Sequence, residues 1–277
     1  KQYENFLWNL QIAFLMVLGA AVVTFFHLDK ALREGKRRDR LVFAVAGVIA
    51  SFSSLHGLVV WPVAATAIGV SCLSSKKPLF KPVAGILALG LLVGVAYSIG
   101  YQRPSYHPVY LQRGPGAAVS FFLALVASWT SIHYPQYAMG TGILVSVLAV
   151  ALFLHLFRTG KIAEHVFPWC LIGFGYAVAG MVAIGRSGME EGLALALASK
   201  YASFTLPIYV GLALIVYQQY LADAPNAAGP PRIRKMVLAA MGLLTVLLLV
   251  VDGAYLYGCL KWRNARRAGV EVIRNYR

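Results

Sequence analysis

Charged residues are scarce in this sequence, at 13% of 277 residues, and only ten of them are acidic. Soluble domains carry about 25% charged residues, so this low content argues against a soluble enzyme or binding module. Cysteine is also rare, since only Cys72, Cys170 and Cys259 occur, in or beside apolar runs. These three match no metal-ligand spacing and indicate no disulfide framework, so we interpret them as small apolar residues.

Short motifs typical of several enzyme classes are missing as well. The sequence has no GxxxxGK[ST], GxSxG, HExxH or CxxC motif, which argues against a P-loop ATPase, serine hydrolase, zinc protease or thiol redox enzyme. No relay of Asp, His and Arg runs through the apolar segments, which argues against a proton-driven transporter. The formal charge of +15 comes with no motif that reads nucleic acid, so we expect no nucleic-acid partner.

Long apolar runs are the dominant feature, with 59% hydrophobic residues and a mean hydropathy of +0.69. A helix needs about 20 apolar residues to cross a bilayer. We therefore predict an all-α fold, a polytopic transmembrane helix bundle with about seven full spans. The segment 117–129 is too short for an easy crossing and predicts one further, partial or re-entrant helix. The apolar runs cover residues 6–26, 41–55, 58–72, 83–99, 139–157, 166–184, 204–221 and 236–256.

Basic residues gather in the short segments between these runs, at 27–40, 74–81, 158–161 and 230–235. Such segments favour the cytoplasmic side, where they also meet anionic lipid. We expect residues 1–277 to form a single transmembrane domain. We expect its basic tail at 261–277 to be a surface helix or a disordered end. The tail lies on the outer side of the membrane in this topology, contrary to the preference of basic segments for the cytoplasm. The opposite, outer face then carries the 53–57, 100–116 and 185–201 segments together with Glu4.

Cationic residues on the predicted outer face are candidates for binding phosphate. Arg103 and His107 lie in a loop stiffened by proline, and a guanidinium suits phosphate well. Arg186 lies between glycines in GRSG, where a ligand can approach the backbone closely. Lys200 precedes an apolar run, and His56 interrupts two of them. The alternatives are headgroup anchors, a turn cap at His107 and a helix-hairpin turn at His56.

Carboxylates and tyrosines complete the candidate site. Glu4, Glu190 and Glu191 lie on the same predicted face and are candidates for acid–base chemistry. The alternatives are an interfacial cap at Glu4 and a solvated first helical turn for the pair. Tyr201 is a candidate ligand contact or a member of the interfacial aromatic belt. No spacing indicates a metal site.

Several short stretches, taken in order, resemble a group of bacterial multi-spanning membrane proteins that look like GT-C-type glycosyltransferases. They are ENFLW at 4–8, SFSSLHGLVVWP at 51–62, GYQRPSYHP at 100–108, GRSG at 185–188 and SKYASFTLP at 199–207. The group usually has Ser-Arg-Tyr where this chain has Ser199, Lys200 and Tyr201. Lysine keeps the charge there but loses the bidentate fork of arginine.

The resemblance implies transfer of a sugar from a polyprenyl-phosphate carrier to an envelope acceptor at the outer face of the inner membrane. No other cofactor is expected. Arg103, His107, Arg186 and Lys200 would contact phosphate, and Tyr106 and Tyr110 would stack on sugar. The usual catalytic base lies upstream of the ENFLW stretch, so we expect an N-terminal part to precede Lys1. The alternatives are a non-catalytic membrane subunit with protein partners, and third, a lipid flippase or transporter.

Overall fold

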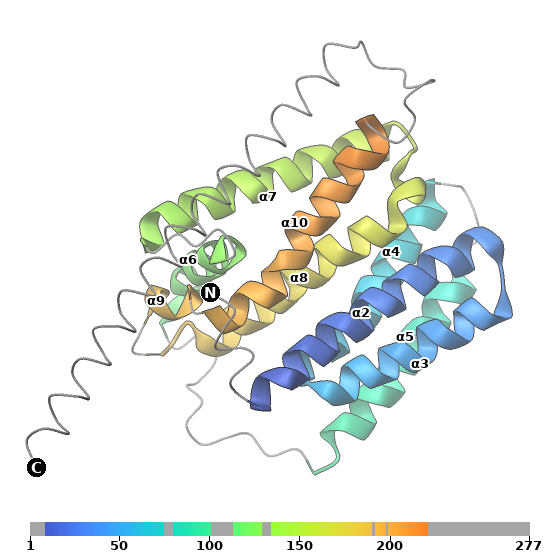
Figure 1. Cartoon of the computed structure of the whole chain (residues 1–277), viewed down its shortest axis with the longest axis horizontal. Coiled ribbons are helices and arrows are strands. Elements are labelled where there is room, and N and C mark those ends of the chain that lie inside the picture. Colours follow the sequence, from blue (N-terminus) through green and yellow to red (C-terminus); the bar gives the residue numbers. More distant parts are fainter. Residues whose placement is uncertain are drawn as a thin grey trace, which may run out of the picture. The chain divides into compact units, whose positions relative to one another are not determined.

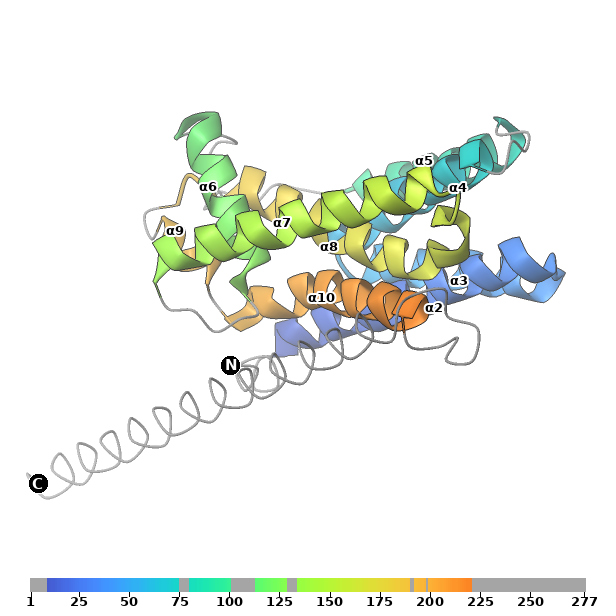
Figure 2. The same cartoon turned by 90° about the horizontal axis from the view of Figure 1, so that it is seen from above.

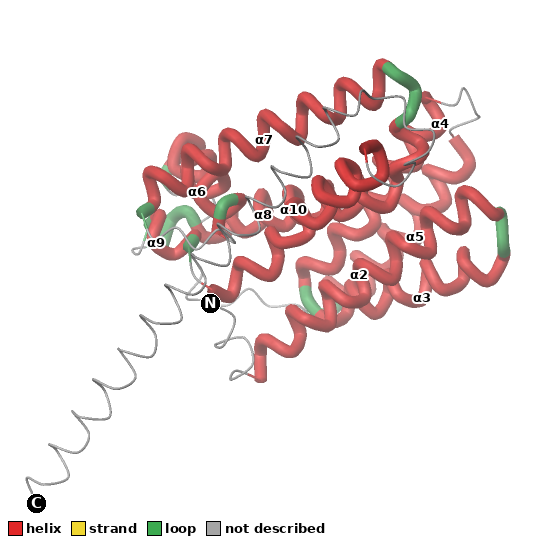
Figure 3. Tube along the Cα trace, turned by 45° about the horizontal axis from the view of Figure 1, so that its top comes forward, coloured by secondary structure: helices red, strands yellow, loops and turns green. Residues whose placement is uncertain are grey.

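The computed structural model describes residues 9–74, 80–100, 113–128, 134–189, 192–197 and 199–220. Every regular element in these residues is a helix, and none of them is a strand (Figures 1 and 3). Residues 2–217 form one compact unit, and 218–220, the last residues of α10, belong to a second. The predicted all-α class is confirmed for the described part of the chain.

Five of these helices are long and apolar enough to cross a membrane: Ile12–Glu34, Leu55–Ser74, Pro135–Arg158, Ile162–Arg186 and Tyr201–Gln219. Val83–Ser98 and Gly114–Val126 are shorter apolar helices. The predicted span at 236–256 and the tail at 261–277 lie outside the described residues. The full set of elements is α2 (Asn9–Glu34), α3 (Arg37–Ser53), η1 (Leu55–Val59), α4 (Val60–Ser74), α5 (Phe80–Ser98), α6 (Gly114–Val126), α7 (Pro135–Arg158), η3 (Ile162–His165), α8 (Val166–Arg186), α9 (Leu193–Ala196) and α10 (Ser199–Tyr220).

The first apolar run continues as a helix well beyond its predicted end. Most of the basic segment 27–40 is helical, because α2 extends to Glu34 and α3 begins at Arg37. Within this extension the Arg33 Nε atom donates to both carboxylate oxygens of Asp29, at 2.9 and 3.0 Å, one helical turn earlier. Such an i,i+4 pair supports a helix, so the loop between α2 and α3 is reduced to two residues.

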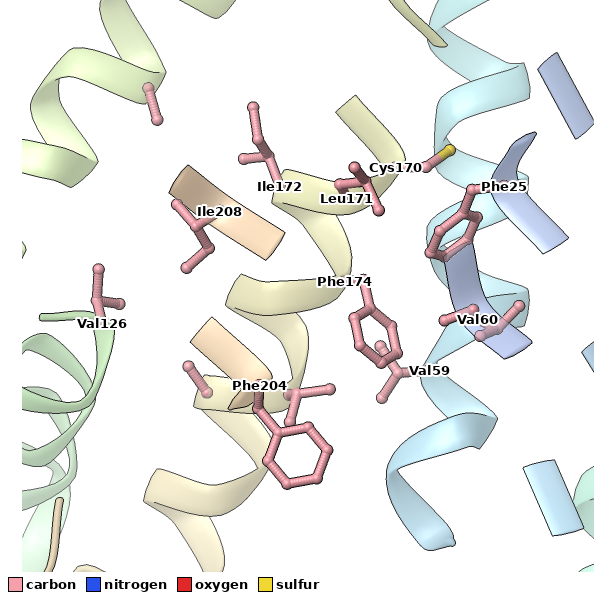
Figure 4. Close-up of a cluster of buried hydrophobic side chains, with 14 of the residues drawn as sticks. Phe25, Val59, Val60, Val126, Cys170, Leu171, Ile172, Phe174, Phe204 and Ile208 are labelled. Carbon is pink, nitrogen blue, oxygen red and sulfur yellow. The ribbon is translucent and has the colours of Figure 1, made fainter. Parts of the chain in front are cut away.

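Helix α8 lies at the centre of the described bundle, with α2, α4, α6 and α10 around it (Figure 1). Its Phe174 side chain is fully buried, and its ring centroid lies 6.0 Å from that of Phe25 on α2 (Figure 4). On the α10 side, a Cβ atom on Gly175 would lie 2.5 Å from the Ile208 side chain. Small residues allow this close approach, as at many interfaces between membrane helices.

The polar break predicted at 53–57 is a tight helical turn, η1, between α3 and α4. The Gly57 amide donates to the Ser54 carbonyl at 2.8 Å. A Cβ on Gly57 would overlap the backbone of Ala50 on α3, so only glycine fits at this position. On the next turn the buried Trp61 Nε1 atom donates to Ser51 Oγ at 2.9 Å. These contacts fix the direction in which α4 leaves the turn.

Helix α6 has 13 residues and runs across α7 rather than along it (Figures 1 and 2). At 1.5 Å per residue it is about 20 Å long, shorter than the roughly 30 Å of hydrocarbon in a bilayer. Its C-terminal end is buried, and the Val126 carbonyl there accepts a hydrogen bond from the Tyr209 hydroxyl at 3.0 Å. Ser128 Oγ, also buried, lies 3.0 Å from Thr205 Oγ1. Two residues of α10 therefore satisfy polar groups where α6 ends.

One face of α7 is a continuous apolar surface. Leu144, Val147 and Val150 are 68%, 60% and 58% exposed. An exposed apolar surface of this length is unfavourable in water and natural in contact with lipid tails. The burial pattern of α7 thus agrees with its length and composition as a membrane-crossing helix.

Candidate functional site

Two polar regions lie at opposite ends of the bundle. The His56 end contains η1, the end of α8 and the start of α10. The Lys36 end contains the α2–α3 turn, the end of α4 and η3. At the Lys36 end, Arg33 donates to the Glu164 carbonyl and Ser74 Oγ donates to the Gly160 carbonyl at 3.3 Å. The basic segments 27–40 and 158–161 and Ser74, the first residue of the segment 74–81, therefore share one end, and the candidate residues His56 and Arg186 share the other.

His56 lies in η1 between two aromatic rings, one from α2 and one from α10. Its ring centroid is 4.7 Å from that of Phe204 and 5.8 Å from that of Phe14, which meets it edge-on. Its Nδ1 atom lies 2.9 Å from Ser54 Oγ. His56 is thus half-buried and held in one orientation by three neighbours, which a simple exposed hairpin turn does not require.

Arg186 occupies the last turn of α8, where a cation interacts favourably with the negative end of the helix dipole. It is half-buried, and its Nη1 atom lies 3.4 Å from Met189 Sδ. It lies at the same end of the bundle as His56 in η1. The structure therefore brings together two of the candidate phosphate-binding residues, from segments 130 positions apart.

Ser187, the neighbour of Arg186, adds a polar group to this end. Its side chain is only 3% exposed, and its hydroxyl has no hydrogen-bond partner among the described residues. A buried hydroxyl without a partner is costly, because it has lost its contact with water. Together, Arg186, His56 and Ser187 supply a fixed cation, an imidazole and a hydroxyl, which are groups that bind an anion.

The other candidate residues are placed only in part. Tyr201, in the first turn of α10, is buried at 5% exposure, so it is not a member of an exposed aromatic belt. Lys200 belongs to the same helical turn, but only its backbone is described. Seven residues of the predicted site lie outside the described residues: Glu4, Arg103, Tyr106, His107, Tyr110, Glu190 and Glu191.

The Lys36 end has its own buried ion contact. Asp39 is 4% exposed, and its Oδ1 atom lies 2.7 Å from Nδ1 of His27 on α2. The hydrogen bond with His27 holds the pKa of Asp39 below its ordinary value, and the charges of Lys30 and Lys36 act in the same direction. This contact joins α2 to α3 and has a structural role. Among the described residues no group of three or more His, Cys, Asp and Glu side chains is placed to bind a metal.

Phe14 and Phe204, which hold His56, were not predicted from the sequence. Phe14 lies in the middle of an apolar run and Phe204 at the start of another, so neither position carries a polar signal. Only the crossing of α2 and α10 near η1 gives them this role. No family model, no curated protein and no solved structure matches this chain.

Proposed function

We propose that this chain is a multi-pass inner-membrane protein that binds a polyprenyl-phosphate-linked sugar at its His56 end. We further propose that it transfers the sugar to an envelope acceptor on the outer face. The observation that carries the proposal is the position of Arg186, half-buried in the last turn of α8, at the same end of the bundle as His56 in η1. A guanidinium binds phosphate through two parallel hydrogen bonds.

Neighbouring groups explain why an anion suits this place. In the tautomer in which the Ser54 hydroxyl donates to Nδ1, the His56 Nε2 atom carries a proton and can donate to a ligand. The Arg186 guanidinium would contribute a charge-assisted hydrogen bond to such a ligand. A lipid phosphate has the charge and the oxygens for both contacts.

The proposed orientation follows from the charge distribution. With the Lys36 end in the cytoplasm, the basic segments lie inside and the His56 end faces outward, as the positive-inside rule requires. In this arrangement α6 is re-entrant, and the other apolar runs cross the membrane. Arg103, His107, Lys200 and Tyr201 would complete the phosphate and sugar contacts. Glu4, Glu190 or Glu191 would act as the base.

The test is the binding of a short-chain polyprenyl phosphate to the purified full chain. Charge-assisted contacts contribute about 1.5–3 kcal/mol, so Arg186→Ala should weaken binding roughly tenfold to a hundredfold. Arg186→Lys should restore part of the affinity, since it keeps the charge and loses the fork. Arg38→Ala, at an exposed arginine at the Lys36 end, is the matched control and should bind as the unmodified chain does.

Equal affinity in the Arg186→Ala and Arg38→Ala variants would contradict the proposal. It would favour the alternative of a non-catalytic subunit, in which Arg186 only anchors the end of α8. Transfer of sugar from a radiolabelled polyprenyl-phosphate sugar is measured separately. Binding without transfer would retain the lipid-phosphate site and remove the enzymatic part of the proposal.

A further inference from the structure

A cavity of about 700 Å³ lies among α4, α6, α7 and α8. Its volume is in the range of sites that bind small molecules. The lining is mostly apolar and includes Val63, Ala67, Phe122, Ala149, Phe153 and Trp169. On α8 the lining ends at Ala177, and Arg186 lies nine residues further on, about 14 Å at the helical rise per residue. The cavity is therefore separate from the candidate phosphate site.

The cavity opens toward the lipid phase. Thr66 on α4 and Val150 on α7 both line it and are both exposed, so its mouth lies between these two helices. Val150 also belongs to the exposed apolar face of α7. A molecule dissolved in the membrane can therefore enter the cavity sideways without passing through water.

Two hydroxyl groups in the cavity wall form a bridge from α8 to α7. The Tyr176 hydroxyl donates to Ser146 Oγ at 3.2 Å, and both residues are half-buried and line the cavity. Serine and threonine hydroxyls within helices often donate to the carbonyl one turn earlier, as Thr141 on the same helix does to Tyr137 at 3.0 Å. The Ser146 hydroxyl contacts Tyr176 instead, and neither side chain makes a further hydrogen bond to a described residue. Two hydroxyls that share one hydrogen bond keep one proton without an acceptor, whichever of them donates.

The depth of this hydroxyl pair restricts which lipid group can accept its proton. Ser146 lies near the middle of the candidate span Pro135–Arg158, and Tyr176 lies near the middle of Ile162–Arg186. At about 1.5 Å per residue, Tyr176 is about 15 Å from Val166 at the start of α8, which is half of the roughly 30 Å of hydrocarbon in a bilayer. The esters and the phosphate of a phospholipid lie at the membrane surface, so only its hydrocarbon reaches this depth. A charged acceptor is costly in hydrocarbon, so the pair suits an uncharged acceptor carried by a lipid-soluble molecule.

We propose that this cavity binds a lipid quinone, with the ring beside Tyr176 and one carbonyl accepting from the Tyr176–Ser146 pair. A quinone ring is uncharged and carries acceptors without donors, which is what a spare hydroxyl proton requires. The hydrocarbon tail of the quinone suits the mouth between α4 and α7, where Val150 lies one turn from Ser146.

Aromatic side chains of the cavity fit a planar ring as well. Phe122 on α6 lines the cavity, and its ring centroid lies 6.0 Å from that of Tyr176. Aromatic rings attract one another beyond the effect of area burial alone, so a quinone ring at this level would gain from both neighbours. This inference does not depend on the proposed function, because it uses none of the residues at the His56 end.

The experiment compares two compounds that share a ring system and a tail. Decylnaphthoquinone carries ring carbonyls, and decylnaphthalene has none. Binding to the purified full chain in detergent is measured by equilibrium dialysis, and the ratio of the two affinities is compared between variants, so that partition into micelles cancels. The double variant Tyr176→Phe with Ser146→Ala keeps the aromatic ring and removes both hydroxyls. The preference for the quinone should fall roughly threefold to tenfold in this variant, as expected for the loss of one hydrogen bond. Ser146→Ala alone should keep the preference, because the Tyr176 proton is then free to donate to the ligand.

Matched variants test the hydroxyls and the cavity separately. Tyr137→Phe removes an exposed hydroxyl from α7 outside the lining and should leave the ratio unchanged. Ala177→Phe fills part of the cavity and should weaken the binding of both compounds roughly tenfold or more, whereas Val147→Phe adds the same ring on the exposed face of α7 and should weaken neither. Thermal unfolding verifies the fold of each variant.

Two results would overturn the proposal. One is the same ratio in the unmodified chain and in the double variant, which would leave a cavity that takes hydrocarbon without reading the carbonyl. The other is unchanged binding of both compounds to a folded Ala177→Phe variant, which would place them elsewhere on the chain.

Discussion

Replacing Gly142 with alanine should separate α6 from α7. A Cβ atom at position 142 would lie 2.8 Å from the carbonyl carbon of Leu123 on α6, and closer still to its oxygen. Carbon atoms in contact are normally about 3.5–4.0 Å apart, so the two backbones would have to move by roughly 0.7 Å or more. The obstacle is backbone in the middle of a helix, which cannot rotate away as a side chain can.

The cost follows from what α6 holds in place. Overpacking a tight interface typically costs about 1–3 kcal/mol. A shift of α6 would also strain the hydrogen bonds that join Val126 to Tyr209 and Ser128 to Thr205, both close to 3.0 Å. Each buried hydrogen bond that is lost adds about 1–3 kcal/mol, because a polar group is left unpaired. We therefore expect Gly142→Ala to destabilise the fold by about 3 kcal/mol.

The assay is reversible unfolding of the purified chain in mixed micelles, with increasing sodium dodecyl sulfate as the denaturant. Gly140→Ala is the matched control, because Gly140 is exposed on the same helix. Apart from its own turn of the helix, no described atom lies within 4 Å of a Cβ atom placed there. Alanine is the better helix former, so this control should be neutral or slightly stabilising. If Gly142→Ala unfolded at the same denaturant fraction as Gly140→Ala, the close packing of α6 on α7 would be refuted.

Two further predictions concern the Lys36 end. Single cysteines that replace Lys36 and Lys161 should react with a membrane-impermeant maleimide from one side of the membrane, and a cysteine that replaces Tyr134 should react from the other side. Labelling of all three cysteines from the same side would contradict the topology. The lowered pKa of Asp39 stabilises the fold above the ordinary value of 3.8, and this contribution is lost as the pH falls through the native value. Thermal unfolding below about pH 4 should therefore be less pH-dependent in Asp39→Asn, and an unchanged pH dependence would show that the His27 contact contributes nothing.

The helical class and the positions of the apolar runs could be predicted from the sequence, because composition and length decide them locally. The end of α2 could not. The segment after residue 26 is polar enough to predict a loop, and its helical structure depends on the Asp29–Arg33 pair and on His27 reaching Asp39 in the next helix. Composition alone does not report such contacts between neighbouring helices.

The site could be predicted less completely than the fold. His56 and Arg186 are recognisable as polar residues among apolar ones, and the expected orientation already put them on one face. The cavity around Trp169 is different, because its walls come from residues 62–71, 146–153 and 162–177. Each of these segments looks like ordinary apolar helix in the sequence. Only the crossing of α4, α7 and α8 leaves space between them.

The buried end of α6 has a consequence for the order in which the chain is assembled during synthesis. The Val126 carbonyl receives its hydrogen bond from Tyr209, 83 residues later in the chain. Until the ribosome has made that residue, α6 has no partner for a carbonyl that cannot be left unpaired in hydrocarbon. We expect the nascent α6 segment to stay at the membrane surface, and to enter the bundle only when α10 arrives.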